Sequence, residues 1–143
     1  LHAAVQADKI TNKSNSHKAR GNFLRFGDVV QLRHRKSHKY ITLRPDSFAS
    51  ELGSMRVELD GNGNSGSHFK VMPGFKHRSE GDRVLIEDQV VLQSVRWSVA
   101  LKQSSDGRAE LIAAKQHSLF QVLCGLCCSA LCRLNTTPHT ACR

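Results

Sequence analysis

Cysteine is absent from residues 1–123 of this 143-residue chain, and all five cysteines fall in residues 124–143. A secreted domain held together by disulfides distributes its cysteines through the fold, so this absence favours a cytosolic or redox-indifferent body. Long apolar runs are missing too. The most apolar segment, residues 119–134, falls short of the roughly 18 uninterrupted apolar residues that predict a membrane span. Residues 1–7 lack the charged start and apolar run of a secretory signal.

Aromatic and acidic residues are also scarce. Tryptophan and tyrosine occur once each, which argues against nucleic acid bound on an aromatic stacking platform. Twelve Asp and Glu stand against 21 Lys and Arg, so the formal net charge is +9. Such a balance means that phosphate, nucleic acid, glycosaminoglycan and acidic protein faces must all be considered as partners. The share of hydrophobic residues, 39%, is that of an ordinary globular domain.

The motifs of common catalytic and metal sites are missing. Residues 60–66 (DGNGNSG) have one carboxylate and no distal bidentate glutamate, so they predict a turn rather than a calcium loop. No glycine-rich loop follows a strand and opens a helix with a lysine behind it, which excludes a P-loop. The eight histidines lie in basic or polar loops without a nucleophile–base arrangement. We therefore predict no enzymatic activity, no cofactor and no metal site.

The cysteine-rich segment, residues 124–143, invites a zinc interpretation. Zinc sites usually pair two short clusters across a loop of about a dozen residues or more, and the spacing here is far more crowded. We favour a tail that is disordered or that results from a mispredicted gene model. A palmitoylated or packed apolar segment is the second interpretation, and zinc binding is the least favoured. The residues concerned are Cys124, Cys127, Cys128, Cys132, His139 and Cys142.

Two stretches of the chain follow the same order of short strand patterns. Residues 27–32 (GDVVQL) and 81–86 (GDRVLI) open them, and Phe69 and Phe120 stand near their ends. A period of about forty residues is typical of repeats in which no single unit buries its own apolar face. Roughly eight to ten short strands without a convincing core helix predict an all-β fold. With four strands per unit, the expected fold is an incomplete β-trefoil, with about two of its three units.

Three parts are expected: a short helical arm and linker at residues 1–20, the partial trefoil at 21–123, and the tail at 124–143. Residues 45–53 are predicted to be a loop with one helical turn. Strands are predicted at residues 30–32, 40–43, 55–59, 69–72, 84–86, 90–92, 99–101, 110–112 and 119–122. The predicted core residues are Val30, Leu32, Tyr40, Ile41, Val57, Leu59, Phe69, Val71, Val84, Ile86, Val91, Leu92, Phe120 and Val122.

In this order and spacing, the motifs resemble the MIR-type trefoil repeat, most closely in the N-terminal domain of inositol trisphosphate and ryanodine receptors. The likeness covers about residues 1–123 and includes 1–4 (LHAA), which is similar to a helical arm that precedes the repeat in the inositol trisphosphate receptors. A first trefoil unit is expected upstream in a longer parent. The motifs that carry the resemblance are 27–34 (GDVVQLRH), 36–42 (KSHKYIT), 55–57 (MRV), 66–69 (GSHF), 78–84 (RSEGDRV) and 90–92 (VVL).

The chain departs from the family pattern at two positions. His68 stands where the family usually has a large aromatic, and an aromatic expected near Ser98 is absent. Trp97 lies next to that second position and has the size to fill the same space.

The resemblance implies a non-catalytic regulatory domain on the cytosolic face of a ligand-gated calcium-release channel of the endoplasmic reticulum membrane. In that family the domain couples ligand binding to gating through contacts with the ligand-binding core and neighbouring subunits of a homotetramer. It holds no inositol phosphate itself. The family loop that corresponds to residues 73–81 lies at an inter-subunit contact, which carries over here to Pro73, Phe75, Lys76 and Arg78.

The most basic segment is residues 33–39 (RHRKSHK), which as a hairpin tip would project Arg33, Arg35, Lys36 and Lys39 into solvent. A solvated loop, a contact with an acidic protein face and a polyanion site all remain open. The alternative function is a free-standing basic MIR trefoil that binds glycans or sulfated or phosphorylated polyanions, since MIR repeats also occur in protein mannosyltransferases. A signal peptide and an early end after the third repeat would mark that alternative, whereas a channel would continue into membrane spans.

Overall fold

The computed structural model describes residues 22–104 and 111–122, together with the single positions 3, 6, 7, 10 and 14. Within the two continuous ranges the chain is all-β, as predicted, with one short 3-10 helix and no α-helix. The arm predicted over residues 1–9 and the tail at 124–143 lie outside the two described ranges. The elements are β1 (Val29–Gln31), β2 (Tyr40–Phe48), β3 (Met55–Asp60), η1 (Ser65–Ser67), β4 (His68–Pro73), β5 (Gln89–Ser94), β6 (Ala100–Gln103), β7 (Leu111–Ala114) and β8 (Phe120–Gln121).

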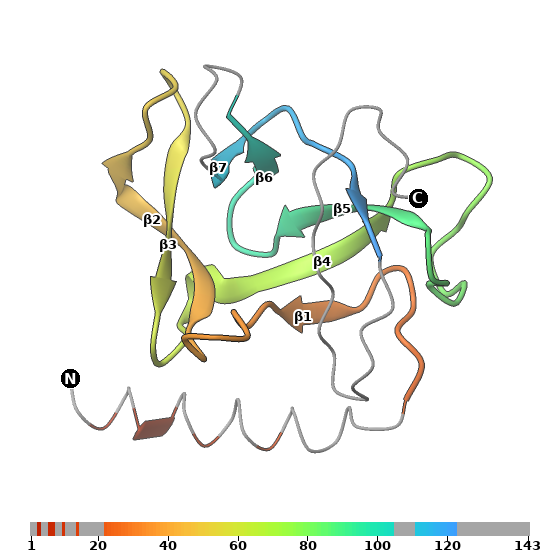
Figure 1. The fold of residues 1–143 in the computed structure, drawn as a ribbon, viewed down its shortest axis with the longest axis horizontal. Helices are drawn as coiled ribbons and strands as arrows, with labels where there is room; N and C mark the ends of the chain where they lie inside the picture. Colours follow the sequence, from red (N-terminus) through yellow and green to blue (C-terminus); the bar gives the residue numbers. More distant parts are fainter. Residues whose placement is uncertain are drawn as a thin grey trace.

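All eight strands belong to one antiparallel sheet in the order β1-β4-β5-β6-β7-β3-β2, and β8 pairs with β5. The sheet curls into an open half-barrel, with β4 and β5 along its middle and the β2–β3 hairpin standing across one end (Figure 1). An isolated bridge between Arg33 and Tyr40 links the continuation of β1 to the start of β2. This arrangement is that of an incomplete β-trefoil.

The repeated Gly-Asp motif forms the same turn in both units. Gly27 and Gly81 have φ angles of 98° and 93°, a left-handed region that favours glycine. The carboxylate of Asp28 accepts the Arg25 N–H, three residues earlier (2.8 Å). In the same way Asp82 accepts the N–H of the residue three positions before it (3.0 Å). The Gly-Asp repeat in the sequence therefore corresponds to a repeated turn in the structure.

The two Gly-Asp turns also pair with each other. The Phe26 N–H donates to the Asp82 carbonyl (2.9 Å), and the Gly81 N–H donates back to the Phe26 carbonyl (2.8 Å). The Arg25 guanidinium adds a hydrogen bond to the Gly81 carbonyl (2.8 Å). The openings of the two units are thus joined at one point of the fold.

Both units bury a closing phenylalanine in the same core. Phe69 and Phe120 are 0% exposed and Phe26 is 2% exposed. Since Phe69 ends the first unit and Phe120 the second, neither unit encloses its apolar residues alone, as the repeat period predicts. The other buried apolar residues are Leu43, Val71, Val90, Val91, Leu92, Ala100, Leu101, Ile112 and Ala113.

Two predicted core residues, Ile86 and Leu59, are exposed rather than buried. Ile86 is 59% exposed because residues 84–86 form no strand: the Leu85 N–H donates to the Asp88 carboxylate (2.8 Å), and Glu87 has a φ of 73°. A side-chain hydrogen bond of this kind competes with sheet pairing and favours a turn. Leu59 is 42% exposed, near the outer end of β3.

The loop predicted at residues 45–53 is shorter than expected. Strand β2 continues to Phe48, with a shift of register between Arg44 and Phe48 that leaves Pro45 outside regular pairing. Proline lacks a backbone donor, so it is tolerated at such an irregularity of an outer strand. The segment predicted as a turn, residues 60–66, runs from the last residue of β3, Asp60, into η1, which begins at Ser65.

The shared core predicts a clear contrast between two phenylalanines. Replacing buried Phe69 by alanine (Phe69→Ala) should lower the free energy of unfolding of the 143-residue chain by about 3 to 5 kcal/mol, measured by urea unfolding. Phe48, which is 83% exposed, is the matched control, and Phe48→Ala should change that free energy by no more than about 0.5 kcal/mol. Equal effects of the two substitutions would show that the core is placed wrongly.

Candidate functional site

The predicted contact loop, residues 73–81, begins at the end of β4, forms the first part of the connection to β5 and is held at both ends. The Gly74 N–H donates to the Gln89 carbonyl (3.0 Å) near the start of the loop. At the other end the Gly81 N–H donates to the Phe26 carbonyl (2.8 Å). Because both ends are fixed to the β body, the middle of the loop projects from a defined place.

Arg78 forms an ion pair within the fold. Its Nη2 lies 3.1 Å from Oδ1 of Asp88, and the two side chains are only 29% and 16% exposed. The second carboxylate oxygen of Asp88 accepts the Leu85 N–H, so one aspartate joins the loop to the turn before β5. The Nε atom of Arg78 is buried and has no hydrogen-bond partner within the described part of the chain. Among the four residues predicted for this loop, Arg78 is therefore an anchor.

Phe75, Lys76 and His77 are exposed in the middle of the loop, and Ser79, Glu80 and Gly81 are exposed at its end. Phe75 is 49% exposed, and its ring stacks on the His77 ring with centroids 5.7 Å apart and an interplanar angle of 16°. Lys76 is exposed beside them, whereas Pro73, at the end of β4, is half-buried. The middle of the loop thus presents two stacked aromatic rings with one lysine beside them, and His77 is a residue that the sequence pattern did not single out.

The basic hairpin tip, residues 33–39, has a well-defined backbone. The His34 N–H donates to the Lys39 carbonyl (2.7 Å), and the His38 N–H donates to the His34 carbonyl (2.8 Å). Nδ1 of His34 lies 2.8 Å from the Ser37 hydroxyl. His38 has a φ of 56°, and histidine is one of the few residue types besides glycine that is enriched in this region.

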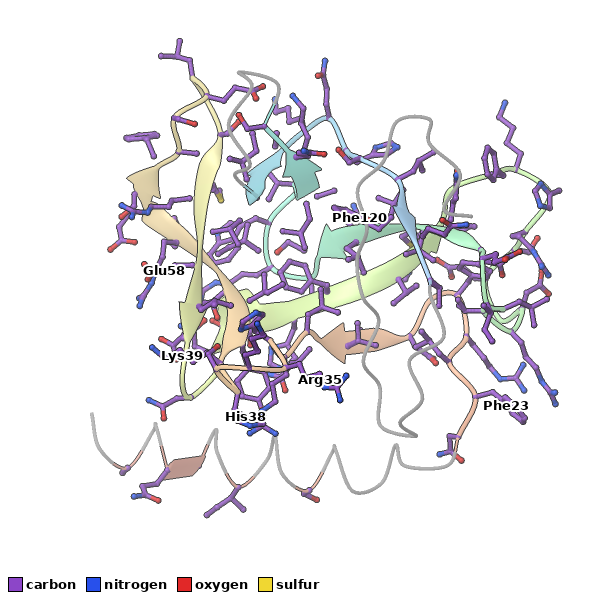
Figure 2. All side chains as sticks on the ribbon, in the orientation of Figure 1. Phe23, Arg35, His38, Lys39, Glu58 and Phe120 are labelled. Carbon is purple, nitrogen blue, oxygen red and sulfur yellow. The ribbon has the colours of Figure 1, made fainter. Side chains whose placement is uncertain are left out.

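The four predicted cations of this tip do not behave alike. Arg33 donates from Nε to the His38 carbonyl (3.0 Å) and lies over the Tyr40 ring, 5.9 Å from its centroid. Arg35, Lys36 and Lys39 are exposed, and within residues 22–104 and 111–122 the structure gives them no ion-pair partner. In Figure 2, Arg35 and Lys39 lie on either side of His38, at the rim of the molecule and away from the core residue Phe120.

The acidic residues closest in the sheet are already engaged. Asp60 is the register partner of Tyr40, and one of its oxygens lies 3.4 Å from Nη2 of Arg44. Glu58 accepts a hydrogen bond from Nε of Arg44, and this bond is the main cause that raises the pKa of the Arg44 guanidinium above its ordinary value. Arg44 therefore stays charged, and it holds both carboxylates on the face of β2 and β3.

A further feature next to the contact loop is an open hollow of about 350 Å³ on the outer face of β4, β5 and β6. Met72, Val91 and Ala100 line it, with Lys115 and His117 at its edge. Among the described residues no group of three or more His, Cys, Asp or Glu is placed to hold a metal ion. Within the same residues no helix is long and apolar enough to cross a membrane.

Comparisons with known proteins bear on the resemblance seen in the sequence. A family model described as "Inositol 1,4,5-trisphosphate/ryanodine receptor" matches residues 2–125. The chain is also 37% identical over 112 residues to the inositol 1,4,5-trisphosphate receptor itr-1 of Caenorhabditis elegans. That alignment covers 78% of this chain and 4% of the relative, so the chain spans a small part of the relative's length.

The inward orientation of Arg78 predicts measurable coupling with Asp88. In a double-mutant cycle of Arg78→Ala and Asp88→Ala, measured by urea unfolding, we expect a coupling of about 1 to 3 kcal/mol because the pair is mostly shielded from solvent. The control is the Lys70–Glu80 pair at 2.7 Å, whose side chains are 37% and 56% exposed. Its coupling should stay below about 1 kcal/mol. Equal coupling in the two cycles would contradict an anchoring role for Arg78.

Proposed function

The chain belongs to the inositol 1,4,5-trisphosphate/ryanodine receptor family, and we propose that it is a non-catalytic regulatory domain of a ligand-gated calcium-release channel. The parent channel lies in the endoplasmic reticulum membrane, with this domain on its cytosolic face. The domain packs against the ligand-binding core and the neighbouring subunits of a homotetramer, and it couples ligand binding to gating through these contacts.

The observation that carries this function is the anchored loop at residues 73–81. An aromatic side chain that is half exposed on a fixed loop is suited to be an interface anchor, because little conformational freedom is lost when it docks. Phe75 is such a side chain, with His77 stacked on it and Lys76 beside it. The Arg78–Asp88 pair keeps the loop on the β body, so that a shift of the domain moves the contact with it.

The mechanism is a rigid-body shift rather than a chemical step. A curled sheet with one core moves as a unit, and packed interfaces switch between discrete arrangements. When the domain shifts, the contact made by Phe75 and Lys76 would shift with it and so change the interface with the neighbouring subunit. Ligand binding and ion conduction belong to parts of the parent outside this chain.

The loop contact is tested in the full-length parent channel carrying Phe75→Ala. Loss of the contact should weaken the coupling, so the ligand concentration that gives half-maximal calcium release from microsomes should rise by about fivefold or more. The channel should remain tetrameric by size-exclusion chromatography. Phe48→Ala, which removes an exposed phenylalanine from the β2–β3 hairpin, is the control and should leave release unchanged.

If Phe75→Ala and Phe48→Ala give the same release curve, the loop is not the coupling contact. The membership of the family would stand in that case. If Phe75→Ala abolishes assembly of the tetramer, the loop contributes to assembly rather than to coupling.

A regulatory domain without a ligand site also predicts a binding result for the chain alone. In equilibrium dialysis with radiolabelled inositol 1,4,5-trisphosphate, the 143-residue chain should take up no saturable ligand. Saturable uptake that Lys36→Gln abolishes would contradict this expectation and place a phosphate site at the basic hairpin tip. Uptake that is linear in ligand concentration and unaffected by Lys36→Gln agrees with it.

A further inference from the structure

The basic hairpin tip is a second surface, separate from the contact loop and not needed for the proposed function. It leaves the β body between β1 and β2, whereas the contact loop lies between β4 and β5. Residues 29–45 contain no Asp or Glu. The exposed cations Arg35, Lys36 and Lys39 therefore have no acidic neighbour in their own stretch of chain.

The tip is folded before any partner arrives. The hydrogen bonds among His34, Ser37, His38 and Lys39 close the turn, and the Arg33 guanidinium ties its base to the His38 carbonyl. A pre-organised surface loses less conformational entropy on binding than a loose loop.

The charge of the tip is not balanced by the adjacent sheet. Glu58 and Asp60 are the carboxylates on the strand that pairs with the start of β2, and both are held by Arg44. An uncompensated group of cations on a convex tip attracts acidic partners and orients them during encounter.

We propose that this tip docks onto a carboxylate-rich segment of protein. The cations are spread around the tip, with Arg35 and Lys39 on either side of His38 (Figure 2). Such a spread matches a row of carboxylates, each of which pairs with one cation. Since the chain spans 4% of its relative's length, most of the polypeptide around such a domain lies outside it and can supply that segment.

Two other acidic partners fit the tip less well. A single phosphate is bound best by donors that converge on one point, including free backbone N–H groups. Here the N–H groups of His34, Ser37 and His38 donate within the hairpin, so three N–H groups of the tip are not available to a phosphate. A membrane surface is bound best when apolar side chains accompany the cations, and residues 33–39 contain none.

The test uses the whole 143-residue chain and a fluorescein-labelled oligoglutamate peptide, with binding followed by fluorescence anisotropy. We expect saturable binding that weakens as salt is added, because exposed charges are screened. The triple variant Arg35→Gln, Lys36→Gln and Lys39→Gln should weaken binding by about tenfold or more. The matched control, Arg56→Gln, Arg83→Gln and Lys115→Gln, removes the same formal charge from exposed positions elsewhere and should bind almost as the unmodified chain does.

Several outcomes would overturn the proposal. Equal losses in the two triple variants would mean that only the total charge matters. If the tip variant loses binding to heparin or to phosphatidylserine vesicles but keeps its binding to oligoglutamate, the tip is a polyanion or lipid site instead. Thermal unfolding followed by circular dichroism checks that the variants fold. Should the triple variant unfold early, Arg35→Gln and Lys36→Gln tested singly should still each weaken oligoglutamate binding, and no loss in either would overturn the docking.

Discussion

The pairing of the two Gly-Asp turns over one phenylalanine core is the constraint on which the rest of the structure depends. Phe26 lies inside the paired turns and touches the same core as Phe69 and Phe120, the closing residues of the two units. Each unit therefore completes the other. Because the strands are held against this common core, the loops between them leave the body at fixed places. The contact loop at residues 73–81 is an example, since its last residue is Gly81 of the second turn.

Among the described residues, some basic side chains are bound to other groups of the fold, and others are exposed without such a partner. The formal charge is the same in both groups, so only the contacts in the structure tell them apart. Arg25, Arg33, Arg44 and Arg78 each bind a carbonyl or a carboxylate of the fold. Planar guanidinium groups suit such fixed roles because they donate in defined directions. The two candidate surfaces instead contain exposed cations, which are Lys76 in the contact loop and Arg35, Lys36 and Lys39 in the basic hairpin tip.

Sequence patterns predicted the repeat, the turns and most strands because these features follow from local chemistry. The limits appear where a side-chain hydrogen bond or ion pair decides the outcome. Residues 81–86 look like 27–32, yet the second stretch becomes a turn because Asp88 takes the Leu85 N–H, so Ile86 faces solvent instead of the core. Arg78 is predicted at a contact from the resemblance, and its ion pair with Asp88 appears only in the structure. The periodicity of the sequence does not predict an ion pair between a side chain of the contact loop and one of the turn that follows it.

The two candidate surfaces lie at opposite ends of one strand pair, which bears on how the domain could transmit a shift. Strands β1 and β4 are antiparallel, with Val29 opposite Lys70 and Gln31 opposite His68. The contact loop follows the end of β4, while the basic hairpin tip follows β1 and so lies beside the start of β4 (Figure 1). Strand β4 has six residues and spans about 20 Å. Strand β4 is hydrogen-bonded to β1 on one side and to β5 on the other. If a partner were docked at each end of β4, a displacement at one contact would reach the other contact as a movement of the whole domain. A movement of this kind needs no hinge within the domain.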